Sequence, residues 1–237
     1  VIIRRVLLAV KEHVPDVIVV DDGSAEEGRA AIAALAEEGI ATVHHRTRNG
    51  GKGAAVKDAL RLARDAGFTH ALQVDADGQH TLTDIPRMLS ASRAAPAALV
   101  LGMPVFDETA PKARVVGRRI TIFWTRLEVG GGAIADPMCG FRIYPLPISA
   151  DVTVWGDRMD FDPEIAVRLV WEGVPTRNVE TRVRYVSAEE GGVSHFHAFK
   201  DNVLISLMHS RLMTLKIMRF LFGWLWRGRS PRGRLPS

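Results

Sequence analysis

Ala71-Leu-Gln-Val-Asp75-Ala-Asp77-Gly-Gln-His80 is the stretch of sequence that decides the fold. A short, mostly apolar run that leads at once into carboxylates and a glycine is typical of a buried strand ending in a polar loop. Two carboxylates one residue apart can hold a hard divalent cation, directly or through a bound water. A polar loop that only caps the following helix has the same local sequence, so the rest of the chain has to decide between them.

Strands and helices alternate on both sides of this stretch. Asp16-Val-Ile-Val-Val20 is a second short apolar run, typical of a buried parallel strand. Further strands are expected at 41–43 and 98–101, and helices at 1–13, 25–38, 52–66 and 84–92. Such alternation predicts an α/β fold, with a doubly wound, mostly parallel sheet flanked by helices. In this fold ligands bind at the carboxyl ends of the strands.

Three polar segments follow strands at that same edge, namely Asp21-Asp22, Asn49-Gly-Gly-Lys52-Gly53 and Asp75-Ala-Asp77. Asp21 and Asp22 can accept hydrogen bonds from a nucleobase or ribose, or can simply form a turn. The spacing around Lys52 does not match a P-loop, and it favours a flexible loop that lets this lysine approach a phosphate. The coincidence of the three loops favours a metal-binding role for Asp75 and Asp77.

The second half of the chain is less regular. Helices are expected at 112–129 and 163–172, a polar loop at 136–142 and a strand at 177–186. The single cysteine, Cys139, excludes an internal disulfide. The 237 residues divide into a domain of residues 1–197 and a C-terminal helix with a basic tail, residues 198–237.

The net charge of +4 belongs to the end of the chain. Residues 198–237 carry +7, so residues 1–197 carry −3, which argues against a nucleic-acid-binding domain. From Arg211 the helix places apolar residues on one side (Met213, Ile217, Phe220, Leu221, Trp224) and cations on the other (Arg211, Lys216, Arg219, Arg227). The charges exclude a membrane span. They leave two interpretations: a helix on an anionic membrane surface, or a helix packed on the body with a solvated basic face.

Several motifs in order resemble the family 2 glycosyltransferases of GT-A fold. They are Val19-Val-Asp-Asp-Gly-Ser24, Asn49-Gly-Gly-Lys-Gly-Ala-Ala55, Gln73-Val-Asp-Ala-Asp-Gly-Gln-His80, Asp136-Pro-Met-Cys-Gly-Phe-Arg142, Met159-Asp-Phe-Asp-Pro-Glu164 and Glu190-Gly-Gly-Val-Ser-His195. The sequence is similar to dolichyl- and polyprenyl-phosphate sugar synthases and to related bacterial envelope-lipid glycosyltransferases. An ordered set of motifs is far more specific than any one of them.

The resemblance implies a metal-dependent inverting transferase that uses a UDP- or GDP-sugar. Asp75 and Asp77, assisted by Gln79, would hold Mg²⁺ or Mn²⁺ on the donor diphosphate. The other implied donor-site residues are Asp21 and Asp22 on the nucleotide, Lys52 close by, Arg142 near phosphate, and Ser194 and His195 in a loop over the diphosphate. The implied acceptor is a lipid or a lipid-linked, polyprenyl-phosphate-like molecule, met on the cytoplasmic face of the plasma membrane through residues 211–234.

The role of Asp136 depends on that acceptor. A hydroxyl acceptor needs a general base, for which Asp136 is the first candidate and Asp160 or Asp162 the second. A phosphate acceptor is already anionic and needs none.

Two departures from the family pattern keep other functions open. Cys139 stands where the polyprenyl-phosphate synthases usually have Ser or Thr. The chain also opens in the helix that follows the family's first strand, so the sheet is expected to lack a central member and the donor site one wall. The alternatives are a catalytically impaired, membrane-associated protein that binds nucleotide sugars, and a nucleotidyltransferase.

Overall fold

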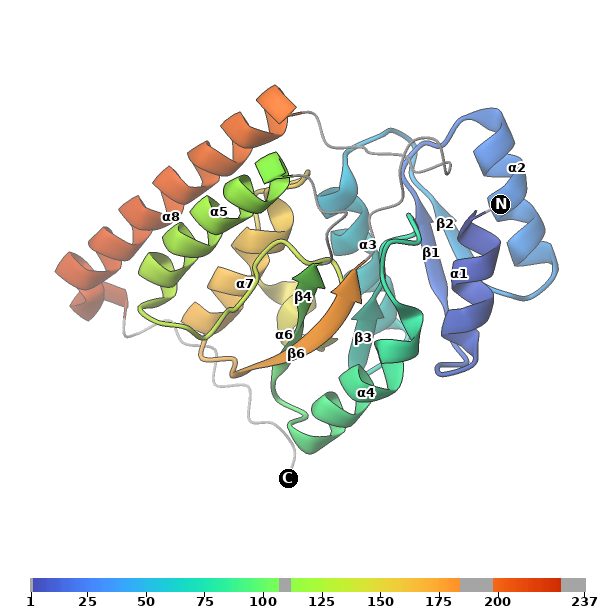
Figure 1. Ribbon diagram of the computed structural model, residues 1–237, viewed down its shortest axis with the longest axis horizontal. Helices are drawn as coiled ribbons and strands as arrows, with labels where there is room; N and C mark the ends of the chain where they lie inside the picture. The colour runs from blue at the N-terminus through green and yellow to red at the C-terminus, as the bar shows by residue number, and fades with distance from the viewer. Residues whose placement is uncertain (1, 107–111, 184–197, 227–237) are drawn as a thin grey trace.

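The computed structural model describes residues 2–106, 112–183 and 198–226. Strands and helices alternate through the first half, as the sequence predicts (Figure 1). The helices are α1 (Ile2–Lys11), α2 (Glu26–Glu37), α3 (Lys52–Asp65), the 3₁₀ turn η1 (Leu82–Asp84), α4 (Ile85–Ala94), α5 (Lys112–Val129), α6 (Ile148–Asp151), α7 (Phe161–Trp171) and α8 (Ala198–Trp226). The strands are β1 (Ile18–Asp21), β2 (Thr42–His45), β3 (His70–Gln73), β4 (Leu99–Phe106), β5 (Arg142–Pro145) and β6 (Thr176–Val183).

The described strands form two sheets rather than one. β1 and β2 pair in parallel, and the other four strands follow the order β3-β5-β4-β6. β4 and β6 are parallel, but β5 is antiparallel to both of its neighbours. The expected α/β fold with flanking helices is confirmed, but in place of one mostly parallel sheet the described strands form two, one of them mixed. The source of the difference is β5, which begins at the last residue of the expected loop and whose arginine does not look like a strand residue.

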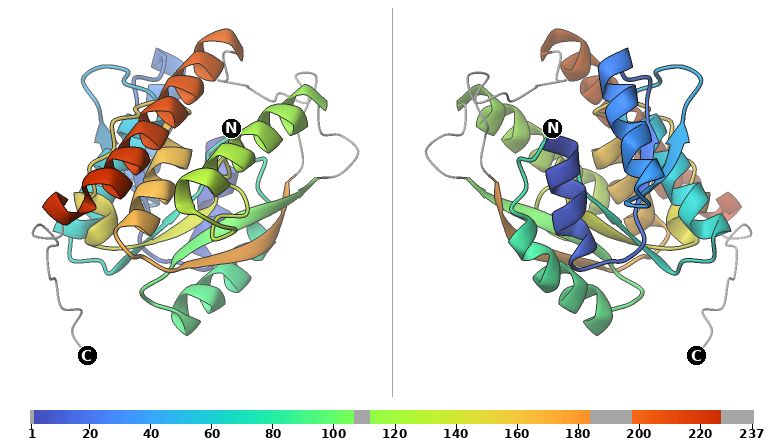
Figure 2. Two further views of the ribbon diagram at one scale, coloured as in Figure 1. Left: turned by 90° about the vertical axis from the view of Figure 1, so that its left-hand side faces the viewer. Right: turned by 90° about the vertical axis from the view of Figure 1, so that its right-hand side faces the viewer.

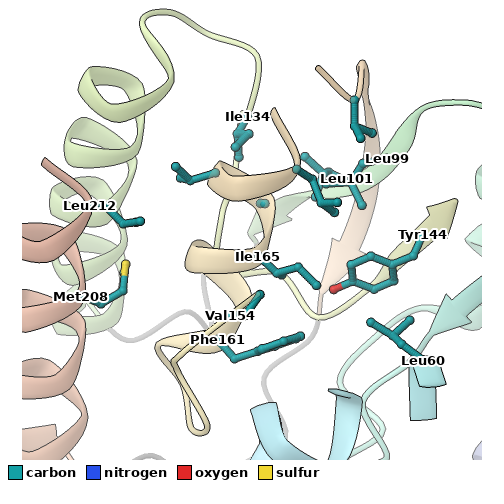
Figure 3. Close-up of a cluster of buried hydrophobic side chains, with 14 of the residues drawn as sticks. Leu60, Leu99, Leu101, Ile134, Tyr144, Val154, Phe161, Ile165, Met208 and Leu212 are labelled. Atoms are coloured by element: carbon teal, nitrogen blue, oxygen red, sulfur yellow. The ribbon is translucent and has the colours of Figure 1, made fainter. Parts of the chain in front are cut away.

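The four-stranded sheet is covered on both faces. Leu99 and Leu101 of β4 join the core on the side of α7, whereas Val100 joins α4 on the opposite side. This alternation follows from the two-residue period of a strand. Figure 2 shows α4 on one face, with α7, α5 and α8 on the other. Figure 3 shows the larger core, where Ile165 of α7 lies between the sheet and Met208 of α8.

Helix α8 packs on the body through Met208 and Leu212, and the cations of its second half also contact the body instead of forming a solvated basic face. Arg211 donates to Glu164, the Lys216 ammonium contacts the carbonyl oxygen of Leu127, and Arg219 donates to the carbonyl of Trp171. The apolar residues of the same stretch face outward instead: Ile217, Phe220 and Leu221 are exposed. Among the described residues, no helix is both long enough and apolar enough to cross a bilayer.

The start of α3 approaches α7 so closely that only glycine fits there. Gly51 has a φ of 100°, and the amide of Ala54 donates to the carbonyl of Asp157. A Cβ atom at Gly53 would lie 2.3 Å from Cβ of Phe161 and 2.8 Å from the carbonyl carbon of Asp157. The carbonyl carbon of Asp157 is part of the backbone, and the Cβ of Phe161 is bonded directly to it. Neither atom can move aside as the far end of a flexible side chain would.

We predict that Gly53→Ala destabilises the protein by about 1–3 kcal/mol, because the added methyl group forces α3 away from α7. Urea unfolding followed by circular dichroism measures the change. Gly117→Ala is the matched control, because its Cβ would meet nothing within 4 Å inside α5. That substitution should be neutral or stabilise by up to about 1 kcal/mol through helix propensity. Equal stability of the two variants would contradict the close approach.

Candidate functional site

Two of the three polar loops come together through hydrogen bonds that the carboxylate of Asp22 accepts. Its carboxylate accepts the backbone amides of Gly50 (2.9 Å) and Gly51 (2.6 Å) and pairs with the guanidinium of Arg46. The turn after β1 is thereby fixed to the turn that starts α3. Asp22 therefore has a structural role, because it holds the loop from which Lys52 projects.

Asp21 is also tied to the protein. The Ser24 amide donates to Oδ1 at 2.8 Å, and Nδ1 of His45, its cross-strand partner on β2, lies 2.9 Å from Oδ2. Burial alone would raise the pKa of this carboxyl, but the hydrogen bonds from Ser24 and His45 outweigh it and lower the pKa to about 2. Asp21 therefore stays anionic at neutral pH.

Lys52 lies between two carboxylates. Its Nζ is 2.8 Å from Oδ2 of Asp75, just past β3, and 2.7 Å from Oδ2 of Asp162, in the first turn of α7. Burial would lower the pKa of Lys52, but the charges of Asp162 and Asp75 outweigh it and raise the pKa above its usual value. Burial also acts to raise the pKa of Asp75, and the ammonium group outweighs it, so this pKa lies well below its usual range.

The expected metal ligands are close in sequence but do not form a closed cluster. Oδ1 of Asp77 accepts the backbone amide of Gln79 at 3.0 Å, while Asp75 pairs with Lys52. Across the described ranges, no three His, Cys, Asp or Glu side chains gather into a group that could hold a metal ion. The oxygen donors suit a hard cation, and the buried Oδ1 of Asp162 has no hydrogen-bond partner among described residues. The carboxylate oxygens of Asp75, Asp77 and Asp162 are thus of the chemical type that binds Mg²⁺ or Mn²⁺.

His80 also belongs to the site, although the sequence motifs predict no separate role for it. Its Nε2 lies 3.8 Å from Oδ2 of Asp75, and its ring packs on Phe141 with 5.4 Å between centroids. Within the described part of the chain, its Nδ1 is buried without a hydrogen-bond partner. The Gly-Gln-His continuation of the motif was the available signal.

Asp136 is an anchor as well as a candidate base. Its Oδ1 accepts the amides of Met138 and Cys139, and its Oδ2 lies 2.5 Å from the guanidinium of Arg118 on α5. These donors occupy three of the roughly four acceptor positions of the carboxylate, so Asp136 holds both its own loop and Arg118 in place. Arg118 was missed because the helical pattern does not show which arginine of α5 faces the loop.

Arg142 lies behind the site rather than in it. It is fully buried and donates to the carbonyl oxygens of Cys139, Pro137 and the Asp162 backbone. The sequence predicts that Arg142 meets phosphate; in this arrangement no surface of its guanidinium is accessible. Its role is to fix the loop of residues 136–140 against α7.

A second contact links that loop to the first carboxylate. Tyr144, next but one to Arg142 on β5, donates to Oε1 of Gln73 at 2.9 Å. Burial raises the pKa of its hydroxyl to about 12, so the group remains a donor. A Cβ on Gly140 would lie 2.2 Å from Oδ2 of Asp75, so the loop backbone lies directly against that carboxylate.

The second candidate bases separate into different roles. Oδ1 of Asp160 accepts the Arg158 amide just before α7, and burial raises the pKa of its carboxyl. Asp162 pairs with Lys52, as described above. Burial raises the pKa of the Cys139 thiol to about 11, so it stays protonated at neutral pH. Ser194 and His195 lie outside the described residues.

Comparison with known proteins supports the resemblance. The sequence model of glycosyl transferase family 2 matches residues 2–145, more than half of the chain. The chain is similar to the undecaprenyl-phosphate mannosyltransferase of Micrococcus luteus, with 38% identity over 138 residues, 54% of this chain and 54% of that protein. It is also similar to the polyprenol monophosphomannose synthase of Mycolicibacterium smegmatis, with 33% identity over 135 residues, 54% and 50%. The chain thus spans about half the length of these curated relatives.

Solved structures agree in fold. Glucosyl-3-phosphoglycerate synthase from Mycobacterium tuberculosis superposes with a TM-score of 0.60 at 15% identity, covering 91% of this chain and 74% of that one. Another mycobacterial protein gives a TM-score of 0.59 at 18% identity, covering 79% and 64%. At these identities the likeness is one of fold, here the GT-A fold. The ordered motifs, the carboxylates that they bring to one edge and the family match agree: the chain belongs to glycosyl transferase family 2.

Proposed function

We propose that the chain is a metal-dependent, inverting glycosyltransferase that moves a hexose from a nucleotide-diphosphate donor to a polyprenyl-phosphate-like acceptor. The observation that carries the proposal is Lys52 between Asp75 and Asp162, at the edge where three polar loops converge. Family membership supplies the reaction class. The printed names of the two curated relatives supply the acceptor class and make mannose the first donor sugar to test.

On the donor side, Asp75 and Asp77 with Gln79 would hold Mg²⁺ or Mn²⁺. Bound there, the cation would supply positive charge to the leaving diphosphate. Lys52 keeps Asp75 ionised and oriented, and Asp22 holds the turn from which Lys52 projects. Asp21, Asp22 and Lys52 remain the proposed nucleotide contacts, with Ser194 and His195 in the loop beyond the described residues.

On the acceptor side, Arg118 and Asp136 form one charged pair. A phosphate acceptor brings its own negative charge, so it needs a cation to hold it in line rather than a base. Asp136 holds the guanidinium of Arg118, which makes Asp136 a positioning residue in this reaction. A membrane-borne acceptor supports the proposal of a peripheral enzyme at the cytoplasmic face of the plasma membrane, with residues 211–234 as the membrane contact.

We predict that Asp77→Asn weakens Mn²⁺-dependent binding of a UDP- or GDP-sugar about tenfold or more, because a neutral amide is a poor ligand for a hard cation. Asn can still accept the Gln79 amide, so the loop keeps its hydrogen bond. Asp75→Asn should weaken binding too, with a loss of stability because Lys52 loses a partner. Isothermal titration calorimetry with and without Mn²⁺ measures both.

Asp65→Asn is the control for this experiment, because Asp65 lies at the exposed end of α3 and pairs only with its neighbour Arg64. Its binding should match that of the unmodified chain. Metal-dependent affinity that survives in Asp77→Asn and Asp75→Asn would rule out the metal assignment. A parallel comparison of UDP- and GDP-sugars identifies the donor base.

We further predict that Asp136→Asn raises KM for a polyprenyl-phosphate acceptor about tenfold to a hundredfold, the value of one charge-assisted hydrogen bond. The pH dependence of kcat should keep its shape, because no base is removed. A pH–rate profile over the acid range measures this. A fall in kcat of about 10²–10⁴, with loss of the acid limb, would instead show that Asp136 is the general base.

A further inference from the structure

An exposed apolar stripe runs along α5. It consists of Val116, Ile120, Phe123, Trp124 and Leu127, which recur at the spacing of one helix face and are each 38–57% exposed. The buried residues of the same helix, Thr121, Thr125 and Glu128, are polar. A surface helix of a soluble protein normally shows the reverse distribution. Apart from the ring of His209, which stacks on Trp124, the exposed side of the stripe is not covered by the described residues.

Helix α8 extends this surface. Its outward residues include Val203, Leu207, Ile217, Phe220 and Leu221, with Leu207 60% and Phe220 87% exposed. α5 and α8 lie side by side in both views (Figures 1 and 2). Nδ1 of His209 lies 2.7 Å from Oε1 of Glu128, and its ring stacks on Trp124. With the contact of Lys216 to Leu127, these interactions fix the helices as one surface, called the α5–α8 face below.

The exposed charges of the two helices themselves have one sign. Arg119, Arg126 and Lys200 are exposed, whereas the acidic residues of the two helices, Glu128 and Asp201, are both buried. The chain after α8 adds four more arginines. Two copies of such a face would repel each other. An apolar stripe flanked by exposed cations instead fits a bilayer that contains anionic lipid. Such a bilayer has negatively charged headgroups above an apolar interior.

We propose that the α5–α8 face docks on an anionic lipid bilayer, with the apolar stripe of α5 inserted below the headgroups. This goes beyond the contact of α8 and the tail, because it makes α5 a membrane-binding element. It rests on the proposed function only in that the acceptor is membrane-borne. α5 also carries Arg118, held by Asp136, so docking sets this guanidinium at a fixed distance from the lipid surface.

The test is co-sedimentation of the full chain with vesicles of phosphatidylcholine and phosphatidylglycerol in equal parts, beside vesicles of phosphatidylcholine alone. The unmodified chain should bind the anionic vesicles more strongly. Phe123→Glu and Leu207→Glu should each reduce the vesicle partition coefficient about tenfold or more. Each removes an apolar side chain that would insert into the bilayer and adds a negative charge that the anionic lipids repel.

Two substitutions of the same kind outside the face are the matched controls. Phe68→Glu lies in the turn between α3 and β3, and Leu8→Glu lies on α1, and both original side chains are exposed. They should bind vesicles as the unmodified chain does. Thermal melting by circular dichroism confirms that each variant is folded. The share of tryptophan quenching by brominated lipid that Trp124→Phe removes gives a measurement that needs no charged residue.

Undiminished vesicle binding by Phe123→Glu, or equal binding to both vesicle types, would overturn the proposal. A dimer in lipid-free buffer that Phe123→Glu dissociates, with no vesicle binding, would overturn it in favour of a second copy as the partner. Mn²⁺-dependent nucleotide-sugar binding in solution should be unchanged in all four glutamate variants. Vesicle binding without any sugar transfer would sink the proposed function and leave the docking surface standing.

Discussion

The ammonium group of Lys52 holds together the three segments that make the site. It connects the first residue of α3 with the carboxylate after β3 and with the first turn of α7. Partial removal of three charges from water is costly, and the mutual attraction offsets this cost only if the geometry is kept. The geometry depends on Gly53, which allows α3 to approach the backbone of Asp157. Without Lys52, Asp75 and Asp162 would face each other as like charges, so the same contact orders the fold and sets the ionisation of the site.

Behind this contact, buried polar groups hold one another in place. The guanidinium of Arg142 donates to backbone carbonyls. The hydroxyl of Tyr144 connects β5 to Gln73, two residues before Asp75. Asp22 and Asp136 act in the same way, each fixing a loop through backbone amides. Charged residues that a family motif presents as ligands can thus be the residues that shape the loops. A substrate would meet a preorganised edge, which is what positioning and electrostatic catalysis require.

On the opposite side of α7, the need of buried polar groups for partners also affects how α8 packs. Its cations find acceptors on the body, at Glu164 and at the carbonyls of Leu127 and Trp171. Arg211 also lies over the ring of Trp155, and Arg219 over that of Trp171. Cations engaged in this way leave the apolar residues of the last turns to face outward. The side of α8 that meets the protein therefore carries both kinds of residue: Ile205, Met208 and Leu212 pack in the core, and the three cations find acceptors beside them.

The sequence by itself determined the alternation of elements, the limits of α3 and α5 to within one residue, and the polar loops that meet at one edge. These follow from local periodicity and from the rule that ligands of α/β sheets bind at the carboxyl ends of the strands. Neither needs knowledge of contacts between distant parts of the chain. It predicted Asp75, Asp77 and Lys52 as one neighbourhood for the same reason. Only the tertiary structure decided that β5 enters the sheet antiparallel, that Arg142 is buried, that Asp162 pairs with Lys52, and which face of α8 is exposed. Each of these depends on a partner far away in the chain, and a helical or strand pattern records which residues share a face but not what that face meets.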